Sequence, residues 1–364
     1  MSKIKVMHCL GQLNTGGAET LVMNIFRHIE RDKFEFDFLL FNDDKGFYDE
    51  EAKSLGANLH YTSSMGHTNI FKYIRSIIKI LKDQNIDIVH SHMDWQGGLI
   101  VYAAYRAGVK KRIVHSHANQ GMFKTSLLHR LLITINKYLI KRYATDCIAC
   151  SQEAGESLFR QPFEVLINGI DIERFLNPNQ EIINQLKQEL NIQDTDIILG
   201  NVGSLSENKN QRFLIQILSK LDKKYKLVLV GDGSMKYELK QFSKELNVMD
   251  RVIFAGVRKE IPEIMQLFNI FLFPSKKEGL GIVAIEAQVS GIPCIVSESI
   301  PEQVDIGQGL IKRKPLIINE WLESIINIDK NKTNINKQKI TDSQFNIKKS
   351  CEKLLKIYKG DKNE

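Results

Sequence analysis

The strongest constraint on the fold is an alternation of short apolar runs with segments of helical spacing, which occurs twice along the chain. Strands that alternate with helices favour βαβ units and a parallel sheet with helices on both faces. In the first block, the expected strands are 3–10, 34–41, 86–90, 113–115, 146–149 and 165–167, and the expected helices are 18–28, 69–84, 97–107 and 127–142.

The alternation weakens between residues 174 and 196, where Asn-Pro-Asn at 177–179 is a typical break. It then resumes, with strands expected at 197–202, 226–230, 252–255, 270–274 and 293–297, and helices at 212–221, 235–246, 261–267 and 281–290. The sequence therefore predicts an α/β protein of two Rossmann-like, doubly wound parallel-sheet domains that face a central cleft, where ligands of open α/β sheets bind.

The predicted boundaries follow from this pattern. We expect an N-terminal domain over 1–170, a linker over 171–195 and a C-terminal domain over 196–340. The tail 341–364 is expected to form a helix that packs back on the first domain. A length of 364 residues suits two domains rather than one core.

Composition excludes several classes of protein. The net charge of +7 is compatible with nucleic acid, an anionic membrane or phosphate-bearing substrates, but the chain has no finger spacing, basic heptads or aromatic-interleaved basic strand. We therefore expect no nucleic-acid partner. The five scattered cysteines do not form a disulfide framework, and no secretory signal or membrane-spanning run is evident. A cytoplasmic protein is expected.

The most informative segment runs from Phe273 to Glu286, after an expected strand and into an expected helix. Glu278 and Glu286 have seven residues between them. Gly279 and Gly281 allow close approach of the backbone to a ligand, and the free N–H groups of the helix start favour a diphosphate. Two glutamates alone would more often be solvated surface residues. The surrounding glycines, strand and apolar helix favour a binding site.

This segment resembles the E-x7-E signature of family-four retaining glycosyltransferases, which have the GT-B fold and build capsules, exopolysaccharides and cell-envelope glycans. The resemblance extends over most of the chain. Further matches are Gly16-Gly17-Ala18-Glu19-Thr20, Asn168-Gly169-Ile170-Asp171, Val202-Gly203-Ser204 through Lys209-Asn210, Val230-Gly231-Asp232-Gly233 and Phe254-Ala255-Gly256-Val257.

The resemblance implies a set of donor-binding residues. They are Gly16, Gly17, Ser204, Lys209, Gly231, Val257, Glu278, Gly279, Leu280, Gly281, Ile282 and Glu286. Lys209 would hold the donor diphosphate, Glu286 the ribose hydroxyls, and Glu278 the hydroxyls of the transferred sugar, as one of two catalytic residues. The chain departs from the family at Ser204, where most members carry Arg. Lys276, Lys277 or Arg258 would have to replace that cation.

Two His-Ser-His motifs close expected strands of the first domain, at 90–92 and 115–117. By resemblance, His117 is the second catalytic residue and contacts the 6-hydroxyl of the transferred sugar. The other three histidines would otherwise be residues of the core or the cleft wall. No carboxylate pattern accompanies them, so we expect no metal and no cofactor beyond the nucleotide-sugar co-substrate. Cys147-x-x-Cys150 lacks a partner pair for a zinc or redox site.

The segment 124–142 combines leucine and isoleucine at helical spacing with Arg130, Lys137 and Lys141. Such a basic amphipathic helix can lie on an anionic membrane surface and bring a lipid-linked acceptor to the protein. The alternative is a packed helix with a solvated basic face. We therefore expect a glycan or polyprenyl-linked acceptor. If the helix lies on a membrane, we also expect a peripheral location on the inner face of the cell membrane.

The family is retaining, and no carboxylate is placed as an obvious nucleophile. A front-face reaction with a UDP-sugar, or else a GDP-sugar, is therefore expected. Two alternatives remain open. A GT-B epimerase would need acid/base carboxylates in the cleft, and the E-x7-E segment argues against it. A non-catalytic GT-B partner subunit is favoured by Ser204 but disfavoured by Lys209, Glu278 and Glu286.

Overall fold

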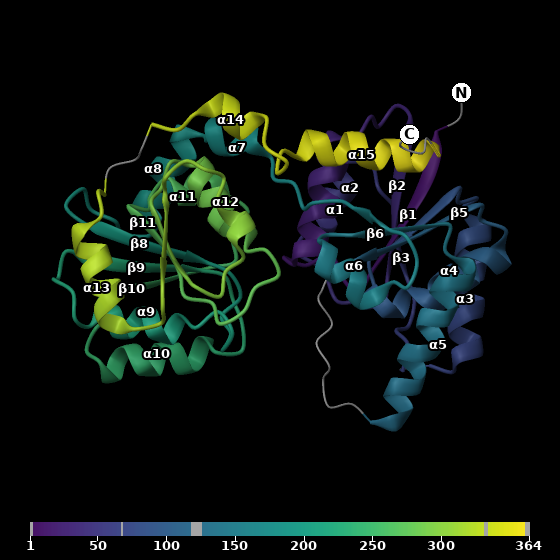
Figure 1. Cartoon of the computed structure of the whole chain (residues 1–364), viewed down its shortest axis with the longest axis horizontal. Coiled ribbons are helices and arrows are strands. Elements are labelled where there is room, and N and C mark those ends of the chain that lie inside the picture. The colour runs from purple at the N-terminus through teal and green to yellow at the C-terminus, as the bar shows by residue number, and fades with distance from the viewer. Residues whose placement is uncertain (1–2, 67, 118–125, 331–333, 361–364) are drawn as a thin grey trace. The chain divides into compact units, whose positions relative to one another are not determined.

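The computed structural model describes residues 3–66, 68–117, 126–330 and 334–360. The chain divides into two compact units (Figure 1). Unit 1 comprises residues 1–170 and 344–364, and unit 2 comprises residues 171–343.

Unit 1 is built on a seven-stranded parallel sheet. Its strands are β1 (Ile4–Leu10), β2 (Phe34–Leu40), β3 (Leu59–Tyr61), β4 (Ile88–Ser91), β5 (Lys111–Ser116), β6 (Asp146–Ala149) and β7 (Glu164–Val165). The strand order is β3-β2-β1-β4-β5-β6-β7. Strand order therefore reverses between β1 and β4, and the carboxyl ends of these two strands flank the expected ligand position.

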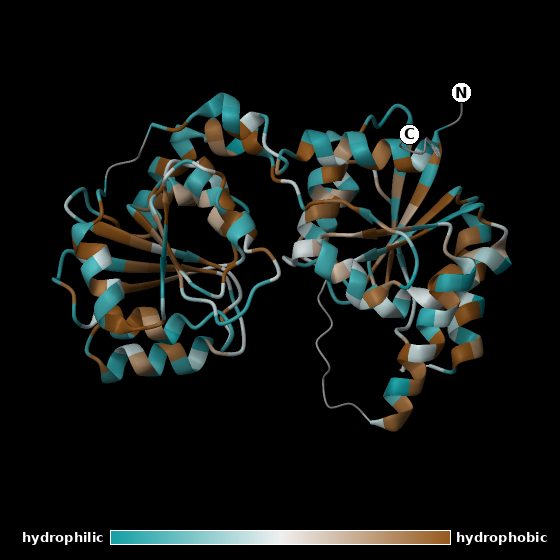
Figure 2. Ribbon diagram, in the orientation of Figure 1, coloured by the Kyte–Doolittle hydropathy of each residue, from teal (hydrophilic) through white to brown (hydrophobic). Residues whose placement is uncertain are grey.

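The helices of unit 1 are α1 (Gly17–His28), α2 (Asp49–Ser54), α3 (Ile70–Asp83), α4 (Gly97–Ala107), α5 (Leu127–Tyr143), α6 (Gln152–Leu158) and α15 (Ile347–Lys359). The C-terminal helix α15 packs against α1. Its Ile347, Leu354 and Tyr358 lie in the hydrophobic core that the sheet shares with Phe26 of α1. The brown strands inside both units in Figure 2 show this apolar interior.

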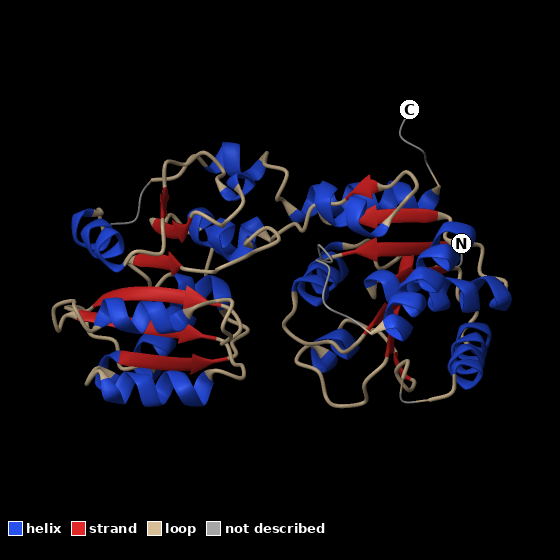
Figure 3. Cartoon of the chain, turned by 60° about the horizontal axis from the view of Figure 1, so that its bottom comes forward, coloured by secondary structure: helices blue, strands red, loops and turns tan. Residues whose placement is uncertain are grey.

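Unit 2 has a six-stranded parallel sheet. Its strands are β8 (Ile197–Val202), β9 (Tyr225–Val230), β10 (Val252–Gly256), β11 (Ile270–Phe273), β12 (Cys294–Ser297) and β13 (Ile311–Lys314), in the order β10-β9-β8-β11-β12-β13. Figure 3 shows these strands side by side with helices on both faces. Here the strand order reverses between β8 and β11.

The helices of unit 2 are α7 (Ile172–Leu176), α8 (Gln180–Glu189), α9 (Gln211–Leu218), α10 (Lys236–Glu245), α11 (Ile261–Met265), α12 (Ile282–Val289), α13 (Ile318–Asn327) and α14 (Lys337–Thr341). Trp321 of α13 is fully buried and packs edge-on against Phe213 of α9. The predicted fold class of two Rossmann-like parallel-sheet domains is confirmed.

The stretch 171–195, expected as a linker, contains α7 and α8 and belongs to unit 2. The polar composition of α8 suggested a connector, but contacts with α11 anchor it. Glu189 pairs with the guanidinium of Arg258, and the carboxylate of Glu263 accepts from the Asn179 backbone N–H at 3.3 Å. None of the described helices is both long and apolar enough to cross a membrane.

Candidate functional site

The candidate donor site of unit 2 lies where its strand order reverses. The loop after β8 (203–210) and the loop after β11 (274–281) leave adjacent strands at the same edge of the sheet. These loops carry most of the unit 2 residues that the sequence singled out. Parallel strands bring them together although some 70 residues separate them in sequence.

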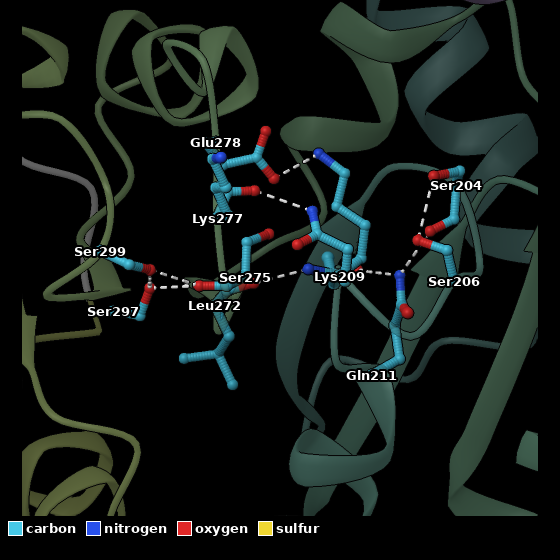
Figure 4. A network of polar contacts seen from close by, with 12 residues as sticks. Ser204, Ser206, Lys209, Gln211, Leu272, Ser275, Lys277, Glu278, Ser297 and Ser299 are labelled. Carbon is cyan, nitrogen blue, oxygen red and sulfur yellow. Dashed lines mark hydrogen bonds and ion pairs between the residues drawn. The ribbon is translucent and has the colours of Figure 1, made fainter. Parts of the chain in front are cut away.

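Polar side chains tie the two loops to each other (Figure 4). The amide of Asn208 donates to the Lys277 carbonyl at 2.7 Å, and the amide of Asn210 donates to the Pro274 carbonyl at 3.3 Å. The Lys276 backbone N–H in turn donates to the Asn208 carbonyl at 2.8 Å. These bonds hold the loops in a fixed mutual position.

Lys209 and Glu278 meet across the two loops. The Lys209 ammonium lies 2.6 Å from a Glu278 carboxylate oxygen and 5.1 Å from the centre of the Phe273 ring. The side chains are only 21% and 12% exposed, respectively, so the pair is largely removed from water. Lys209, the cation expected to hold a diphosphate, is thus paired with Glu278, the carboxylate expected to contact the sugar.

Ser204 is exposed and lies beside Ser206, with the two hydroxyl oxygens 3.5 Å apart. The replacement of its missing charge by Arg258 is not supported, because that guanidinium already binds Glu189 and the Ala255 carbonyl. Lys276 lies 3.3 Å from the Glu207 carboxylate, in an exposed pair that costs little to break. Lys276 therefore remains a cation that a ligand could recruit.

Glycines allow the loop backbones to approach closely. A Cβ atom at Gly231 would lie 2.1 Å from the Gly203 carbonyl oxygen, and φ is +132° at Gly231. Gly281 precedes α12 with φ of +88°, and a Cβ there would lie 2.9 Å from the Phe273 ring. A side chain at Gly231 would push the loop after β9 away from the loop after β8, and one at Gly281 would clash with the Phe273 ring. The N-cap of α12 is thus a glycine, which makes no side-chain hydrogen bond to the first turn of the helix.

Of the other predicted unit 2 residues, Gly279 and Val257 are exposed, and Leu280 and Ile282 are partly exposed. Glu286 lies on the second turn of α12 and is 9% exposed. Burial raises the pKa of its carboxyl to about 8, although the charge of Arg174 opposes this shift. The carboxyl of Glu286, the expected ribose contact, is therefore largely protonated at pH 7.

In unit 1, Gly16 and Gly17 begin α1 after β1. The Glu19 carboxylate folds back over this helix start, since a Cβ at Gly16 would lie 2.0 Å from its oxygen. Burial raises the pKa of Glu19. An anionic ligand at the N-terminus of α1 would have to displace this side chain or find it protonated.

Five histidines gather at the carboxyl ends of β1, β4 and β5, and they are His8, His90, His92, His115 and His117. The rings of His115 and His117 are 4.0 Å apart between centroids, and those of His90 and His115 are 5.4 Å apart and stacked. Burial lowers the pKa of His8 and His117 to about 3 and that of the other three well below the usual value. All five rings are therefore neutral at pH 7.

The sequence motifs identified His90, His92, His115 and His117. They did not identify His8, which lies within an apolar strand and belongs to no motif. Within the described part of the chain, His8, His90 and His92, and likewise His92, His115 and His117, have ring nitrogens within 4.8 Å of one another. A metal ion could bridge such distances. Hydrogen bonds between the rings already use several of these nitrogens.

Helix α5 carries an apolar stripe that nothing in the described residues of unit 1 covers. The exposed fractions are 84% at Leu127, 68% at Leu128 and 55% at Leu131. On the opposite face, Asn136 and Ile140 are buried. Arg130, Lys141 and Arg142 are exposed near the stripe, whereas the Lys137 ammonium is held by the Ser157 carbonyl at 2.7 Å.

Comparison with known proteins identifies both halves of the chain. Residues 15–174 match the model of Glycosyltransferase Family 4, and residues 182–339 match that of Glycosyl transferases group 1. EpsF of Bacillus subtilis (strain 168), named as a glycosyltransferase, is 38% identical over 336 residues, which cover 89% of this chain and 87% of EpsF. CapH of Staphylococcus aureus, a capsular polysaccharide biosynthesis glycosyltransferase, is 28% identical over 98% of both chains.

The fold is also similar to that of solved structures. Anabaena Alr3699/HepE, solved in complex with UDP and glucose, superposes with a TM-score of 0.80 at 20% sequence identity. The match covers 98% of this chain and 100% of that protein.

Proposed function

Because the chain belongs to the family-four glycosyltransferases, we propose that it transfers a sugar from a UDP-sugar, with retention of anomeric configuration, to a glycan or polyprenyl-linked acceptor. Capsule, exopolysaccharide or cell-envelope glycan synthesis is the proposed context, since the similar CapH acts in capsular polysaccharide biosynthesis. The UDP donor is supported by the UDP complex of HepE.

The observation that carries this proposal is the pairing of Lys209 with Glu278 in the loop that leads into α12, whose N-cap Gly281 makes no side-chain hydrogen bond to the helix. A nucleoside diphosphate leaving group develops negative charge as the glycosidic bond breaks. Lys209 and the first N–H groups of α12 would stabilise that charge. Once the diphosphate has displaced it from Lys209, Glu278 would accept hydrogen bonds from hydroxyls of the sugar. The backbone of Gly279 and Leu280 would contact the donor.

The departing diphosphate would deprotonate the incoming acceptor hydroxyl, so no protein carboxylate serves as a nucleophile. The chain then contributes position and charge, and the proposed chemistry needs no metal. His117 would contact a hydroxyl of the transferred sugar. Because burial keeps the pKa of His117 near 3, it would do so as a neutral ring.

A panel of UDP-, GDP- and ADP-sugars with a lipid-linked acceptor tests the proposal. Transfer from a UDP-sugar is the expected result. Epimerisation without transfer would identify a GT-B epimerase. If no nucleotide sugar binds, the proposed transferase function is wrong, and the non-catalytic partner subunit that Ser204 favours becomes the better hypothesis.

The ribose contact can be tested with Glu286→Gln. We expect this isosteric change to weaken UDP binding about tenfold, because a buried hydrogen bond to a charged group contributes roughly 1.5–3 kcal/mol. The same change should weaken the binding of 2′-deoxy-UDP, which lacks one ribose hydroxyl, much less. Titration calorimetry of both proteins with both nucleotides measures the four affinities of this thermodynamic cycle. Equal losses for the two nucleotides would rule out the contact.

Donor binding is also expected to release a proton. The pKa of Glu286 is about 8 in the empty site, whereas two ribose hydroxyls favour the carboxylate. UDP affinity should therefore rise with pH up to about 8 and level off above it. The rise should be smaller in Glu286→Gln, which shares every other titrating group. Calorimetry from pH 6 to 9 measures both curves, and parallel curves would contradict the assignment.

We further propose that the exposed stripe of α5 binds an anionic membrane surface, where lipid-linked acceptors reside. The exposed leucines and the exposed Arg130, Lys141 and Arg142 of the same helix provide the apolar and cationic parts of such a surface. In a flotation assay, vesicles rich in phosphatidylglycerol should carry the protein, and salt should weaken the binding. Replacement of Leu127, Leu128 and Leu131 by Ser should abolish it, whereas Tyr237→Ser on α10 should not. Equal flotation of the two variants would refute the surface.

A further inference from the structure

A chain of hydrogen bonds runs from the C-terminal helix to His117 within unit 1. The Tyr358 hydroxyl lies 2.8 Å from His90 Nδ1 and 3.5 Å from His8 Nε2. His8 Nδ1 lies 3.0 Å from His92 Nε2, and His92 Nδ1 lies 2.9 Å from His117 Nε2. The register of the parallel strands produces this chain, because His8 on β1 is paired with His90 on β4.

Each neutral imidazole has one N–H donor and one bare acceptor nitrogen. A ring that donates through Nδ1 must therefore accept through Nε2. All rings in this hydrogen-bond chain are neutral, so the nitrogen that carries the proton on one ring determines which nitrogen carries it on the next. The chain has only two complete arrangements, one with every donor directed toward His117 and one with every donor directed away from it.

The two ends of the chain decide between these arrangements. His90 Nε2 and His117 Nδ1 are buried atoms with no hydrogen-bond partner among the described residues. His90 is fully buried, whereas His117 is partly exposed. An unpaired N–H is a rarer and more costly group inside a protein than an unpaired acceptor. Because His117 is the less buried of the two residues, the N–H without a partner belongs on His117 and the bare nitrogen belongs on His90.

We propose that His8 and His92 act as positioning residues that hold His117 in the tautomer with its proton on Nδ1, in a chain that His90 and Tyr358 complete. In this arrangement His90 donates to the Tyr358 oxygen, Tyr358 donates to His8, His8 to His92, and His92 to His117. His117 thus has its N–H at Nδ1 and no bare ring nitrogen, since Nε2 accepts from His92. A group that bonds to this N–H must be an acceptor, which under the proposed function is a hydroxyl oxygen of the donor sugar.

The tautomer can be read directly by NMR of protein labelled with ¹⁵N-histidine, without any substrate. The His117 signals, assigned from their loss in His117→Gln, should have the ¹⁵N shifts of a protonated Nδ1 and a bare Nε2. His92→Leu removes the donor to His117 Nε2, so that neither tautomer of His117 is favoured, and should convert these shifts to averaged values. Tyr237→Phe, an exposed tyrosine of unit 2, should leave them unchanged.

Three results would overturn the inference: a proton on His117 Nε2 in the unmodified protein, unchanged His117 shifts in His92→Leu, or zinc bound at the cluster in the purified protein. If His92→Leu proves poorly folded, the position of the proton in the unmodified protein still decides the question. The NMR measurement uses unliganded protein and does not depend on activity. If the protein proved to have no transferase activity, the proposed function would be refuted and this inference would stand.

Discussion

Replacing Lys209 with Met is expected to lower kcat/KM for the donor by about 10²–10³-fold, the usual loss when a fixed group that stabilises transition-state charge is removed. Two features of the structure suggest a value at the upper end. The Lys209–Glu278 pair is largely shielded from water, and the family's second cation is replaced by Ser204. Met preserves the apolar stem against Phe273, so the loss should come from the charge.

Lys226→Met is the matched control. Lys226 lies near the start of β9, at the edge of the sheet opposite the two loops, and its ammonium pairs with Asp196 at 2.7 Å in a similarly shielded pair, with side chains 18% and 10% exposed. Its loss should change kcat/KM by less than about threefold, because it lies far from the developing charge. Steady-state kinetics with one UDP-sugar compares the variants. Equal effects at Lys209 and Lys226 would mean that the diphosphate is not held where we place it.

Glu278→Gln separates the two tasks of the pair. Without the carboxylate, Lys209 is free for the diphosphate, so UDP should bind as tightly as before or more tightly. Turnover should nevertheless fall, because the hydroxyls of the sugar lose a charged acceptor. Parallel losses of UDP affinity and kcat would instead assign Glu278 a purely structural role.

The second large effect is expected at His115, and it concerns stability. Both ring nitrogens of His115 are buried without a hydrogen-bond partner among the described residues. Burial and the neighbouring His117 and His92 lower its pKa well below the usual value. The unfolded ring binds a proton near pH 6.5, whereas the folded ring does not. The unfolded state therefore gains protons as pH falls, and stability is lost below about pH 6.5.

His115→Phe should remove both penalties. We expect it to stabilise the chain by about 1–3 kcal/mol at pH 7.5, the cost of an unpaired buried polar group, and by about 2 kcal/mol more at pH 5. His115→Gln should raise the free energy of unfolding at pH 5 by the same pH-dependent amount but not at pH 7.5, since glutamine is polar and does not titrate. Urea unfolding at both pH values measures these differences. A gain from His115→Phe that does not grow at pH 5 would contradict the neutral cluster.

The sequence predicted the fold well where amphipathic or apolar periodicity was strong. The limits of 97–107, 146–149 and 197–202 coincide with α4, β6 and β8. It missed β3 and β13, because short edge strands such as Ile311–Lys314 carry no clear apolar run. It also read α8 as a connector, because the contacts that anchor this helix come from α11, about 80 residues later.

At the candidate site, motifs identified residues but could not predict their interactions. Lys209 and Glu278 were assigned separate tasks, and their pairing depends on the adjacency of β8 and β11. The amides of Asn208 and Asn210 and the hydroxyls of Ser297 and Ser299 were missed. Both hydroxyls donate to the Ser275 carbonyl, at 2.6 and 2.7 Å, and such bonds to backbone have no spacing signature. Polar residues at strand ends were the available signal.

Glu286 and the histidines illustrate a second limit. Sequence alone suggested a ribose-binding carboxylate, but the pKa near 8 follows from burial within unit 2. His8 became part of the histidine cluster through strand register, and Tyr358 reached it because α15 packs against the sheet of unit 1. These features combine segments that are distant in sequence, so local pattern could not reveal them.

The loops after β8 and β11 are proposed to bind the donor's nucleoside diphosphate. Hydrogen–deuterium exchange with and without saturating UDP tests this binding, because it reports on individual loops and needs no acceptor. We predict slower exchange in segments 203–210 and 274–282, and loss of this protection in Lys209→Met. Unchanged exchange in both segments at saturating UDP would mean that these loops do not hold the diphosphate.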